Sequence, residues 1–304
     1  MKAPNDPSEI VGYVRGLPAG ERLARNIALL DAVPLIDLEL ASICNVSCSF
    51  CPRQQVVRSD MLMSEATFLA FQSFLPLGAV IMISGMGDSL LHPRAVEMVR
   101  SLVDRGHSVC LVTNGLRLTP DCQQHLIGAG ISQFQVSLHG LDADSAALKI
   151  TEPYNLQLVL ANLEYLSRNR PNHLRVRVNF VETPGNAVAA RTVEAYASNQ
   201  GFEYYHRRLH CRGGALGEGR PAARDEGCGI YSSVTFISSD GNILPCVNDV
   251  SGNGLLGNVR TVAWSDVKAW KFRTINEGKW FPSCQHCDDD YRWVLIGMRS
   301  LDQA

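Results

Sequence analysis

The chain has 304 residues, a net charge of −2 and 46% hydrophobic residues, which supplies a core for one large domain or two smaller ones. A nucleic-acid groove would need a basic surface, and a membrane span would need about 20 consecutive apolar residues. The sequence has neither pattern, so nucleic acid and membrane are not expected as partners. The N-terminal segment lacks the apolar core of a secretory signal, so we expect a cytoplasmic protein.

Residues 1–34 carry four prolines and one amphipathic stretch, Glu21 to Leu30, and this pattern predicts a short extension with one helix. From 35 to 210, apolar strands alternate with amphipathic helices. The predicted strands are 35–42, 79–84, 108–113, 131–138, 173–182 and 202–209, and the predicted helices are 64–75, 93–106, 119–130, 154–169 and 187–201. This alternation predicts an α/β fold with a parallel sheet covered by helices, either a partial barrel or an open doubly wound sheet. Both architectures place function at the carboxyl ends of the strands.

The character of the sequence changes after residue 210. Residues 211–227 are rich in Gly, Arg and Ala without a period, which is typical of a linker. Strand-like residues at 231–238 and 242–247 flank an Asp-Gly pair and predict a hairpin. A helix is expected around 265–276. Residues 228–304 are therefore predicted to form a small second domain.

Ten cysteines are many for a chain expected in a reducing compartment, where clustered cysteines bind metal or perform chemistry. Five disulfides in a secreted protein are the alternative, but the long chain and its ample core argue against it. Cys110 lies within an apolar strand and Cys122 opens a helix, so both are predicted to pack in the core.

Three cysteines, Cys44, Cys48 and Cys51, follow the first predicted strand in the run CNVSCSFCP. Thiolates suit both zinc and iron–sulfur clusters. A structural zinc ion would need a fourth ligand from elsewhere in the chain. Three cysteines on four irons leave one iron open, and that iron can bind a small molecule directly.

This CxxxCxxC loop, with Phe50 directly before its last cysteine, resembles the radical S-adenosylmethionine (SAM) superfamily. The resemblance implies a partial (β/α)6 TIM-like barrel and a 4Fe–4S cluster on the three cysteines. It also implies that SAM chelates the open iron through its amino and carboxylate groups. Phe50 matches the aromatic position that contacts the adenine, for which an aromatic ring offers a stacking face.

The run SGMGDSLLHP at 84–93 is similar to the family's GGEP-type motif, whose main chain holds the SAM amino group. Gly85 and Gly87 would let that main chain come close to the cofactor. Asp88 stands where the family has Glu, and Ser89 where it has Pro, so the resemblance carries over the main-chain contacts more firmly than the side-chain role.

Further family patterns follow the next strands, in LVTNG at 111–115 and VSLHG at 136–140. Asn114 belongs to the first of them. Ser137 aligns with a polar residue near the SAM ribose or carboxylate, and Asn179 in the fifth strand is carried over as well. His139 follows Ser137 and is either a site residue or a surface residue.

The second domain holds four cysteines, Cys228, Cys246, Cys284 and Cys287, the last two in a CxxC pair. Four thiolates can hold structural zinc or a second 4Fe–4S cluster. The spacing of the first two around a glycine, and LLGNV at 255–259, resemble the opening of SPASM and twitch domains. The middle cysteines of a full SPASM domain are missing, which implies the shorter twitch version. One auxiliary cluster is then expected, as an electron acceptor or as a structural element.

Cys211 ends the sixth predicted strand at the expected mouth of the barrel. Its thiol could give a hydrogen atom to a carbon radical, or it could be a packing residue. His206, His210 and Arg212 share one strand parity and could bind substrate or take a proton. A solvated strand end is the alternative for all three.

The resemblance implies that SAM is cleaved reductively and that a 5′-deoxyadenosyl radical abstracts hydrogen from the substrate. A chain of this size with a single auxiliary cluster resembles the radical SAM dehydrogenases of aminoglycoside antibiotic pathways. It predicts two-electron oxidation of a carbinol in a polar small molecule, such as a sugar or aminocyclitol, to a ketone.

Three other functions remain open. One is epimerisation with Cys211 as hydrogen-atom donor, and another is peptide modification. A non-enzymatic iron–sulfur or zinc module would leave the SAM motifs unexplained. A flavodoxin or ferredoxin type of protein is expected as the electron donor for the enzymatic functions.

Overall fold

One mixed sheet runs through the chain, whose computed structural model describes residues 7–56, 59–142, 154–217, 227–250 and 252–298. Within these residues the strand order is β6-β5-β4-β3-β2-β1-β7-β8-β9. The strands are β1 Leu35–Leu38, β2 Val80–Ile83, β3 Ser108–Thr113, β4 Gln133–Ser137, β5 Arg175–Glu182, β6 Glu203–Arg208, β7 Val234–Ile237, β8 Asn242–Leu244 and β9 Gly257–Asn258.

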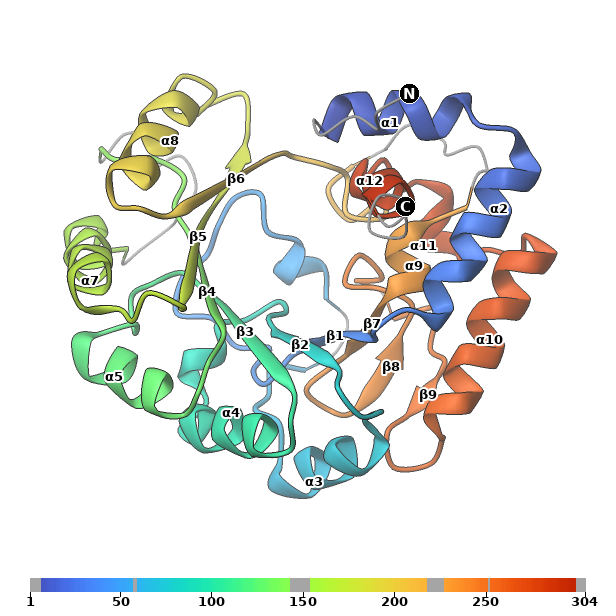
Figure 1. Cartoon of the computed structure of the whole chain (residues 1–304), viewed down its shortest axis with the longest axis horizontal. Coiled ribbons are helices and arrows are strands. Elements are labelled where there is room, and N and C mark those ends of the chain that lie inside the picture. Colours follow the sequence, from blue (N-terminus) through green and yellow to red (C-terminus); the bar gives the residue numbers. More distant parts are fainter. Residues whose placement is uncertain (1–6, 57–58, 143–153, 218–226, 251, 299–304) are drawn as a thin grey trace.

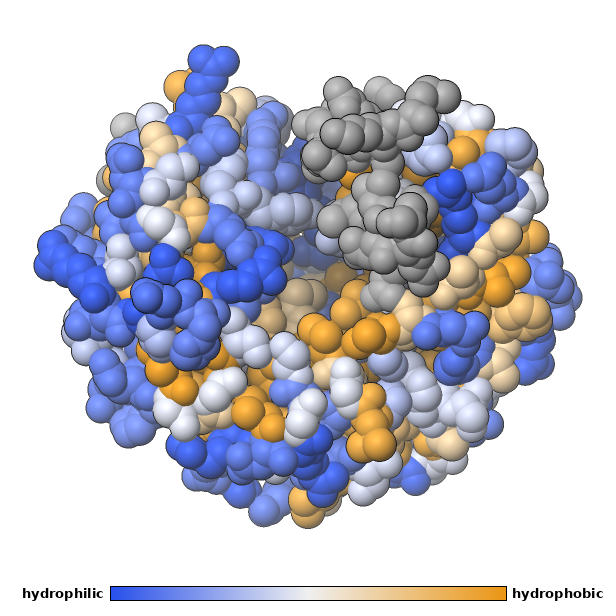
Figure 2. Space-filling model, in the orientation of Figure 1, coloured by the Kyte–Doolittle hydropathy of each residue, from blue (hydrophilic) through white to orange (hydrophobic). Residues whose placement is uncertain are grey.

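The helices lie on the outside of this sheet and beside its C-terminal strands (Figure 1). They are α1 Pro7–Gly16, α2 Ala19–Ala28, α3 Glu65–Phe74, α4 Ala95–Asp104, α5 Pro120–Gly128, α7 Leu156–Asn169, α8 Ala189–Asn199, α9 Gly229–Ser233, α10 Trp264–Glu277, α11 Pro282–Gln285 and α12 Tyr291–Met298. Short 3-10 helices are η1 Leu29–Asp31, η2 Pro52–Gln55 and η3 Ser89–Leu91. Hydrophilic residues dominate the face over α7 and α8 in Figure 2, as expected for helices that turn one apolar side to the sheet.

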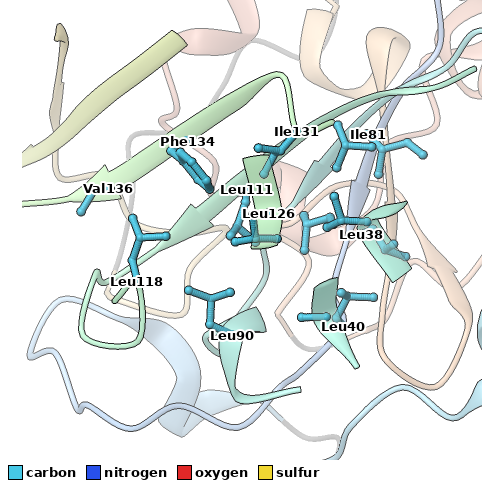
Figure 3. Packing of buried hydrophobic residues seen from close by; sticks show 14 of the residues in the cluster. Leu38, Leu40, Ile81, Leu90, Leu111, Leu118, Leu126, Ile131, Phe134 and Val136 are labelled. Atoms are coloured by element: carbon cyan, nitrogen blue, oxygen red, sulfur yellow. The ribbon is translucent and has the colours of Figure 1, made fainter. Parts of the chain in front are cut away.

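Strands β1 to β6 pair in parallel and in chain order, which confirms the predicted partial (β/α)6 barrel. In Figure 1 they curve into an open ring with α3, α4, α5, α7 and α8 outside. The outward side chains form the main core, in which Leu38, Leu111 and Phe134 are fully buried (Figure 3). Successive side chains of a strand alternate between faces, so polar residues such as Asp37 and Gln135 lie on the inner face.

The C-terminal part continues the barrel sheet, because β7 pairs in parallel with β1 from the register Leu35↔Val234 onward. The predicted hairpin is present as β7 and β8, with Gly241 in the left-handed region at φ 85°. The prediction that residues 231–233 are extended was wrong, since they belong to α9. The Cys228 Sγ atom accepts from the amide of Tyr231 at 3.5 Å and caps that short helix.

The N-terminal extension forms two helices where one was predicted. Helix α1 packs on α12 through a small core that contains Ile10, Val14 and the fully buried Trp293. Helix α2 brings the buried Asn26 within hydrogen-bonding distance of the Ser232 hydroxyl, at 2.6 Å. The extension therefore braces the C-terminal part. Of the predicted linker 211–227, residues 218–226 lie outside the described part.

None of the helices described is long and apolar enough to cross a membrane. The boundaries predicted between extension, barrel, linker and second domain remain predictions, since the sheet itself runs on from β1 into β7.

The buried Asp37 predicts a specific pH dependence of stability. Burial raises its pKa to about 7, and the Ser84 hydroxyl donates to its carboxylate. The folded state then keeps a proton that the unfolded chain, with a pKa of about 3.9, has lost, so stability falls as pH rises from about 4 to 7. Asp37→Asn should remove this loss and stabilise the protein at pH 8 by at most about 4 kcal/mol, with little effect at pH 4.

Thermal midpoints of the anaerobic protein at both pH values measure this effect, with the exposed Asp104→Asn as the matched control. Equal midpoints for Asp37→Asn and the parent at pH 8 would show that the carboxyl is not perturbed as described.

Candidate functional site

The cysteine loop that follows β1 is closed at its base by main-chain pairing. The amide of Ser42 donates to the carbonyl of Met61 at 3.0 Å, and the amide of Met63 donates to the carbonyl of Leu40 at 2.8 Å. In the view of Figure 1 the loop and its short helix η2 are seen through the middle of the ring of strands. The loop therefore starts at the carboxyl end of a barrel strand, where function is expected.

The three thiols of this loop are free and half-buried. Burial raises the pKa of Cys44, and the neighbouring charges of Asp88 and Cys51 raise it further. The amide of Cys51 donates to the carbonyl of Cys48 at 3.0 Å, which keeps the loop compact. Thiols that bind a cluster must lose their protons, and the positive charge of the metal drives that loss.

Gly85 and Gly87 sit where no side chain fits. A Cβ on Gly87 would lie 2.1 Å from the carbonyl oxygen of Ile43, one residue before the first cysteine. Gly85 has φ 131°, and a Cβ there would lie 2.6 Å from Cγ of Glu39. The main chain of this motif thus runs directly against the base of the cysteine loop, as a close cofactor contact requires.

The Asp88 carboxylate forms hydrogen bonds with other residues of the protein. Its carboxylate accepts from the Thr113 hydroxyl and the Asn114 amide, both at 2.8 Å, and from the Leu90 amide at 3.0 Å. Burial raises its pKa, while these hydrogen bonds act in the opposite direction. Asp88 therefore joins the glycine motif to the end of β3, and direct cofactor binding by its side chain remains a prediction.

Three predicted cofactor residues line the inner side of β3 to β5. The Asn114 Nδ2 atom lies 3.9 Å from Cys44 Sγ and 2.8 Å from Asn45 Oδ1, so its amide reaches the cysteine loop. Ser137 and Asn179 are neighbours in the register of β4 and β5. The Oδ1 atom of Asn179 is buried, and no hydrogen-bond donor reaches it from the described residues. A polar cofactor fits here because a buried acceptor needs a donor.

Phe50 is held by His139, which answers the open question about that histidine. The two rings form an edge-to-face pair with centroids 4.9 Å apart and an interplanar angle of 82°. The Nδ1 atom of His139 accepts from the amide of Val181 at 3.1 Å, which fixes the imidazole. His139 is thus a buried residue that orients the aromatic ring expected to meet the adenine.

Glu39 is a site residue that the sequence analysis missed. It is fully buried, and its carboxylate accepts from the Met86 amide at 2.8 Å and from the Ser239 hydroxyl at 3.2 Å. Glu39 therefore ties the glycine motif to the C-terminal hairpin. Acidic residues at 37 and 39, in alternation within an apolar strand, were the available signal for a polar inner face.

The four cysteines of the C-terminal part converge on one pocket, whose lining also includes Tyr231, Trp280 and Arg292. Burial raises the pKa of Cys246 well above its usual value, and the charges of the other three cysteines raise it further. Burial likewise raises the pKa of Cys284 to about 12. Four half-buried thiols that repel one another's charge fit a polynuclear metal centre, whose positive irons remove that penalty.

No three His, Cys, Asp or Glu side chains among the described residues are grouped as ligands of one metal ion. The fit of clusters to the two cysteine sets therefore rests on the donor atoms, their burial and the pocket they share. Asn26 adds support, because it lies against the main chain of the ligand Cys228 once its amide is oriented to satisfy its neighbours.

Three consecutive aspartates after the CxxC pair fasten this site to β6. The Asp288 carboxylate accepts from the Cys211 amide at 2.8 Å, and Asp290 pairs with Arg208 at 2.7 Å. Asp289 pairs with Arg207. Burial alone would raise the pKa of Asp289, but the charges of Arg207 and a nearby histidine lower it overall. The second cysteine set is thereby held beside the inner face of the barrel.

The predicted catalytic residues lie in this junction. The Cys211 thiol is buried and donates to the carbonyl oxygen of His286 at 2.6 Å. Burial lowers the pKa of His210 to about 3. The His210 Nδ1 atom accepts from the Arg212 amide at 3.3 Å, and its Nε2 atom lies 3.7 Å from an Asp289 oxygen. His210 is therefore neutral and oriented by two neighbours. Catalytic roles for these residues remain predictions.

Arg212 and His206 have different surroundings. Arg212 is half-buried, donates to Asn248 Oδ1 at 3.1 Å, and alone among the described non-glycine residues has positive φ, at 52°. His206 pairs with Glu182 at 2.8 Å and packs on Phe180, an outward core residue. The shared parity expected for these residues was wrong, because β6 ends at Arg208 and the chain turns before residue 212.

Family comparisons agree with this geometry. Residues 38–184 match the model of the radical SAM superfamily, and residues 228–288 match SPASM, an iron–sulfur cluster-binding domain. The chain is 30% identical over 145 residues to the AdoMet-dependent heme synthase of Methanosarcina barkeri, covering 47% of this chain and 41% of that protein. It is 28% identical over 124 residues to the GTP 3',8-cyclase of Nostoc punctiforme, covering 38% of each. The chain thus spans less than half the length of these relatives.

Two solved structures share the fold over most of this chain. BtrN in complex with AdoMet and 2-DOIA aligns with a TM-score of 0.58 and 19% identity, over 85% of this chain and 94% of that one. Streptococcus suis SuiB bound to its precursor peptide SuiA aligns with a TM-score of 0.64 and 13% identity, over 87% and 71%.

This chain is a radical SAM protein of the α/β partial-barrel fold, with a C-terminal SPASM-like region. It belongs to the radical SAM superfamily, whose domain implies a 4Fe–4S cluster and SAM, while the SPASM domain implies an auxiliary iron–sulfur centre. The cofactors expected from the sequence are thereby confirmed.

The close packing around Gly87 predicts that adding a side chain there impairs SAM cleavage. Gly87→Ala would place a methyl group against the main chain of residues 41–43 and displace the cysteine loop. We expect SAM-dependent formation of 5′-deoxyadenosine to fall at least about tenfold, since misplacement of a reacting group by about 1 Å costs more than that. Gly128→Ala, where the added methyl meets open space, is the matched control. Unchanged SAM cleavage by Gly87→Ala would contradict the assigned contact.

Iron content tests the two ligand sets separately. The parent chain should bind about eight irons, and changing Cys44, Cys48 and Cys51 to alanine should leave about four. Replacing the four C-terminal cysteines should also leave about four. Cys110→Ala, which removes a cysteine from neither set, should retain the parent value in anaerobic iron and sulfide analysis. A loss of iron in Cys110→Ala equal to that of a ligand set would refute the assignment.

Proposed function

We propose that this chain uses SAM cleavage to oxidise a secondary alcohol of a polar small molecule, a sugar or aminocyclitol, to a ketone. The observation that carries the proposal is the convergence of four half-buried thiols on one pocket beside the inner face of the barrel. Cys287 is two residues from Asp289, whose carboxylate binds Arg207 of β6. An electron acceptor in that pocket would lie next to the strands that face the substrate.

The inner face offers polar groups to such a substrate. Asn179 donates to Gln135 at 3.0 Å, and Arg177 donates to a Glu203 oxygen at 2.9 Å. The Arg177 guanidinium also lies over the Tyr205 ring, 5.7 Å from its centroid. A face lined by such hydrogen-bond donors and acceptors suits the hydroxyl and amino groups of a polar substrate better than an apolar substrate.

When bound, the first cluster and SAM supply a 5′-deoxyadenosyl radical. The carbinol carbon gives it one hydrogen atom, which ends in 5′-deoxyadenosine. To become the ketone, the substrate would then give its hydroxyl proton to a base, for which the neutral His210 is a candidate, and one electron to the auxiliary centre that the four C-terminal cysteines would hold. The residues of β4 to β6 would orient the carbinol and exclude water from the radical.

Epimerisation through Cys211 has less support, because its thiol is engaged with the His286 carbonyl. Structures of anSMEcpe with a bound peptide and of SuiB with its precursor peptide share the fold with this chain at 13% identity, which does not carry over their ligands. We further propose a flavodoxin or ferredoxin type of reductant and a cytoplasmic location, since the ten free cysteines suit a reducing compartment.

Isotope transfer tests the reaction. The anaerobic enzyme is incubated with SAM, a reductant and a panel of aminocyclitols and sugars deuterated at their carbinol carbons, beginning with 2-DOIA. We expect one deuterium in 5′-deoxyadenosine for each ketone formed, measured by mass spectrometry. Cys211→Ser should form ketone at a rate within about twofold of the parent, since a buried packing contact alone is altered.

Epimerisation would give a different isotope pattern. Solvent deuterium would then enter the carbinol carbon, no ketone would accumulate, and Cys211→Ser would cleave SAM without forming product. That result would replace oxidation by epimerisation as the function of this chain.

A further inference from the structure

A buried lysine lies beside the auxiliary site without a carboxylate partner. Lys271 of α10 is 3% exposed, and its Nζ atom donates to the Val234 carbonyl and the Thr235 hydroxyl, each at 2.7 Å. The ammonium also lies 5.5 Å from the centroid of the Tyr231 ring. No carboxylate among the described residues forms an ion pair with it. A buried cation without a counter-charge is costly, so its compensation must come from elsewhere.

Tyr231, whose ring the Lys271 ammonium contacts, lines the pocket together with Cys228 and Cys246, so two cluster ligands lie close to this cation. Burial lowers the pKa of Lys271 to about 7, and the charges of Cys246 and Cys228 act in the opposite direction. Both cysteines must be thiolates when they bind metal. The loaded site therefore supplies the counter-charge that this lysine lacks among the neighbouring carboxylates.

A second buried cation reaches the same pocket from another element. Arg292 of α12 is 8% exposed and lines the pocket together with the four cysteines. Its guanidinium lies 4.4 Å from the centroid of the Trp293 ring. Arg292 therefore brings a second positive charge to the site of the four ligands.

Two acidic groups oppose these cations. Asp249 is near Cys284 and Asp289 is near Cys287, where their charges disfavour the thiolates. Asp289, however, is already paired with Arg207. Asp249 accepts from the Gly254 amide at 2.8 Å, which offsets part of its charge. The two cations therefore keep a net influence on the pocket.

We propose that Lys271 and Arg292 set the reduction potential of the auxiliary cluster by stabilising its reduced form. A centre held by four thiolates becomes more negative when it accepts an electron, and a positive charge in a low-dielectric surrounding favours that change. The two residues act through the cluster, as positioning residues for charge, and touch no reacting atom. The inference rests on the proposed function, in which this centre receives the electron of the substrate.

The test is a redox titration of the complete, anaerobically loaded protein, followed by electron paramagnetic resonance. Added SAM identifies the signal of the first cluster, which then serves as an internal reference. Lys271→Met should move the midpoint of the auxiliary cluster to lower potential and leave that of the first cluster in place. Lys271→Arg keeps the charge and should stay close to the parent.

Lys268→Met is the matched control, because it removes one positive charge from the same helix at a half-exposed position paired with Asp31 at 2.8 Å. It should titrate like the parent. An auxiliary midpoint in Lys271→Met equal to that of Lys268→Met, with full iron content, would overturn the proposal.

Arg292→Gln decides the matter if Lys271→Met fails to retain its iron. A lower auxiliary midpoint in Arg292→Gln supports the proposal, whereas an unchanged midpoint or a midpoint moved upward overturns it. The titration needs no substrate, so it separates the two proposals. Shifted midpoints without ketone formation would leave the role of the cations intact and refute alcohol oxidation.

Discussion

Strand β1 holds the two parts of this protein together, because it forms main-chain hydrogen bonds on both edges. On one side it pairs with β2 of the barrel and on the other with β7 of the C-terminal part, both in parallel. The cysteine loop begins just after this strand, and Glu39 binds the glycine motif and the hairpin at once. Strand β1 thus positions both the SAM site and the auxiliary site.

Charge is the second organising feature, since the molecule buries many ionisable groups. Arginines from β6 pair with Asp289 and Asp290 after the CxxC pair, and Asp288 accepts from the Cys211 amide, so each of these three carboxylates has a cation or an amide as partner. The thiols differ, because burial and mutual repulsion both oppose their ionisation. Only the positive irons can relieve that conflict, and the buried lysine and arginine near the pocket then gain their counter-charges.

The relatives indicate the chemistry that this chain shares with its superfamily, whereas the geometry of the two cysteine sites bears on its particular reaction. Relatives that match the barrel carry out distinct chemistry, such as heme synthesis and GTP cyclisation. The part of this chain that matches the superfamily model, residues 38–184, contains the cysteine loop and strands β2 to β5. Under the proposed function, the fate of the substrate radical would depend on the surroundings of the C-terminal cysteines and on the inner face of β4 to β6. Of these strands only β6 lies beyond the residues 38–184 that match the superfamily model.

The sequence by itself determined the parallel α/β sheet and both cysteine sets, because these depend on strand and helix periods and on local spacing. Its resemblance to the radical SAM superfamily supplied the choice of a partial barrel and the glycine motif. Ser137 and Asn179 were expected in the site from that resemblance, and the structure makes them neighbours in the register of β4 and β5. Only the tertiary structure decided that β7 extends the barrel sheet, that two N-terminal helices brace the C-terminal part, and that Cys211 turns towards His286. Contacts between segments more than 70 residues apart, such as Arg207 with Asp289, leave no local period in the sequence, because burial and charge pairing select them only in the folded chain.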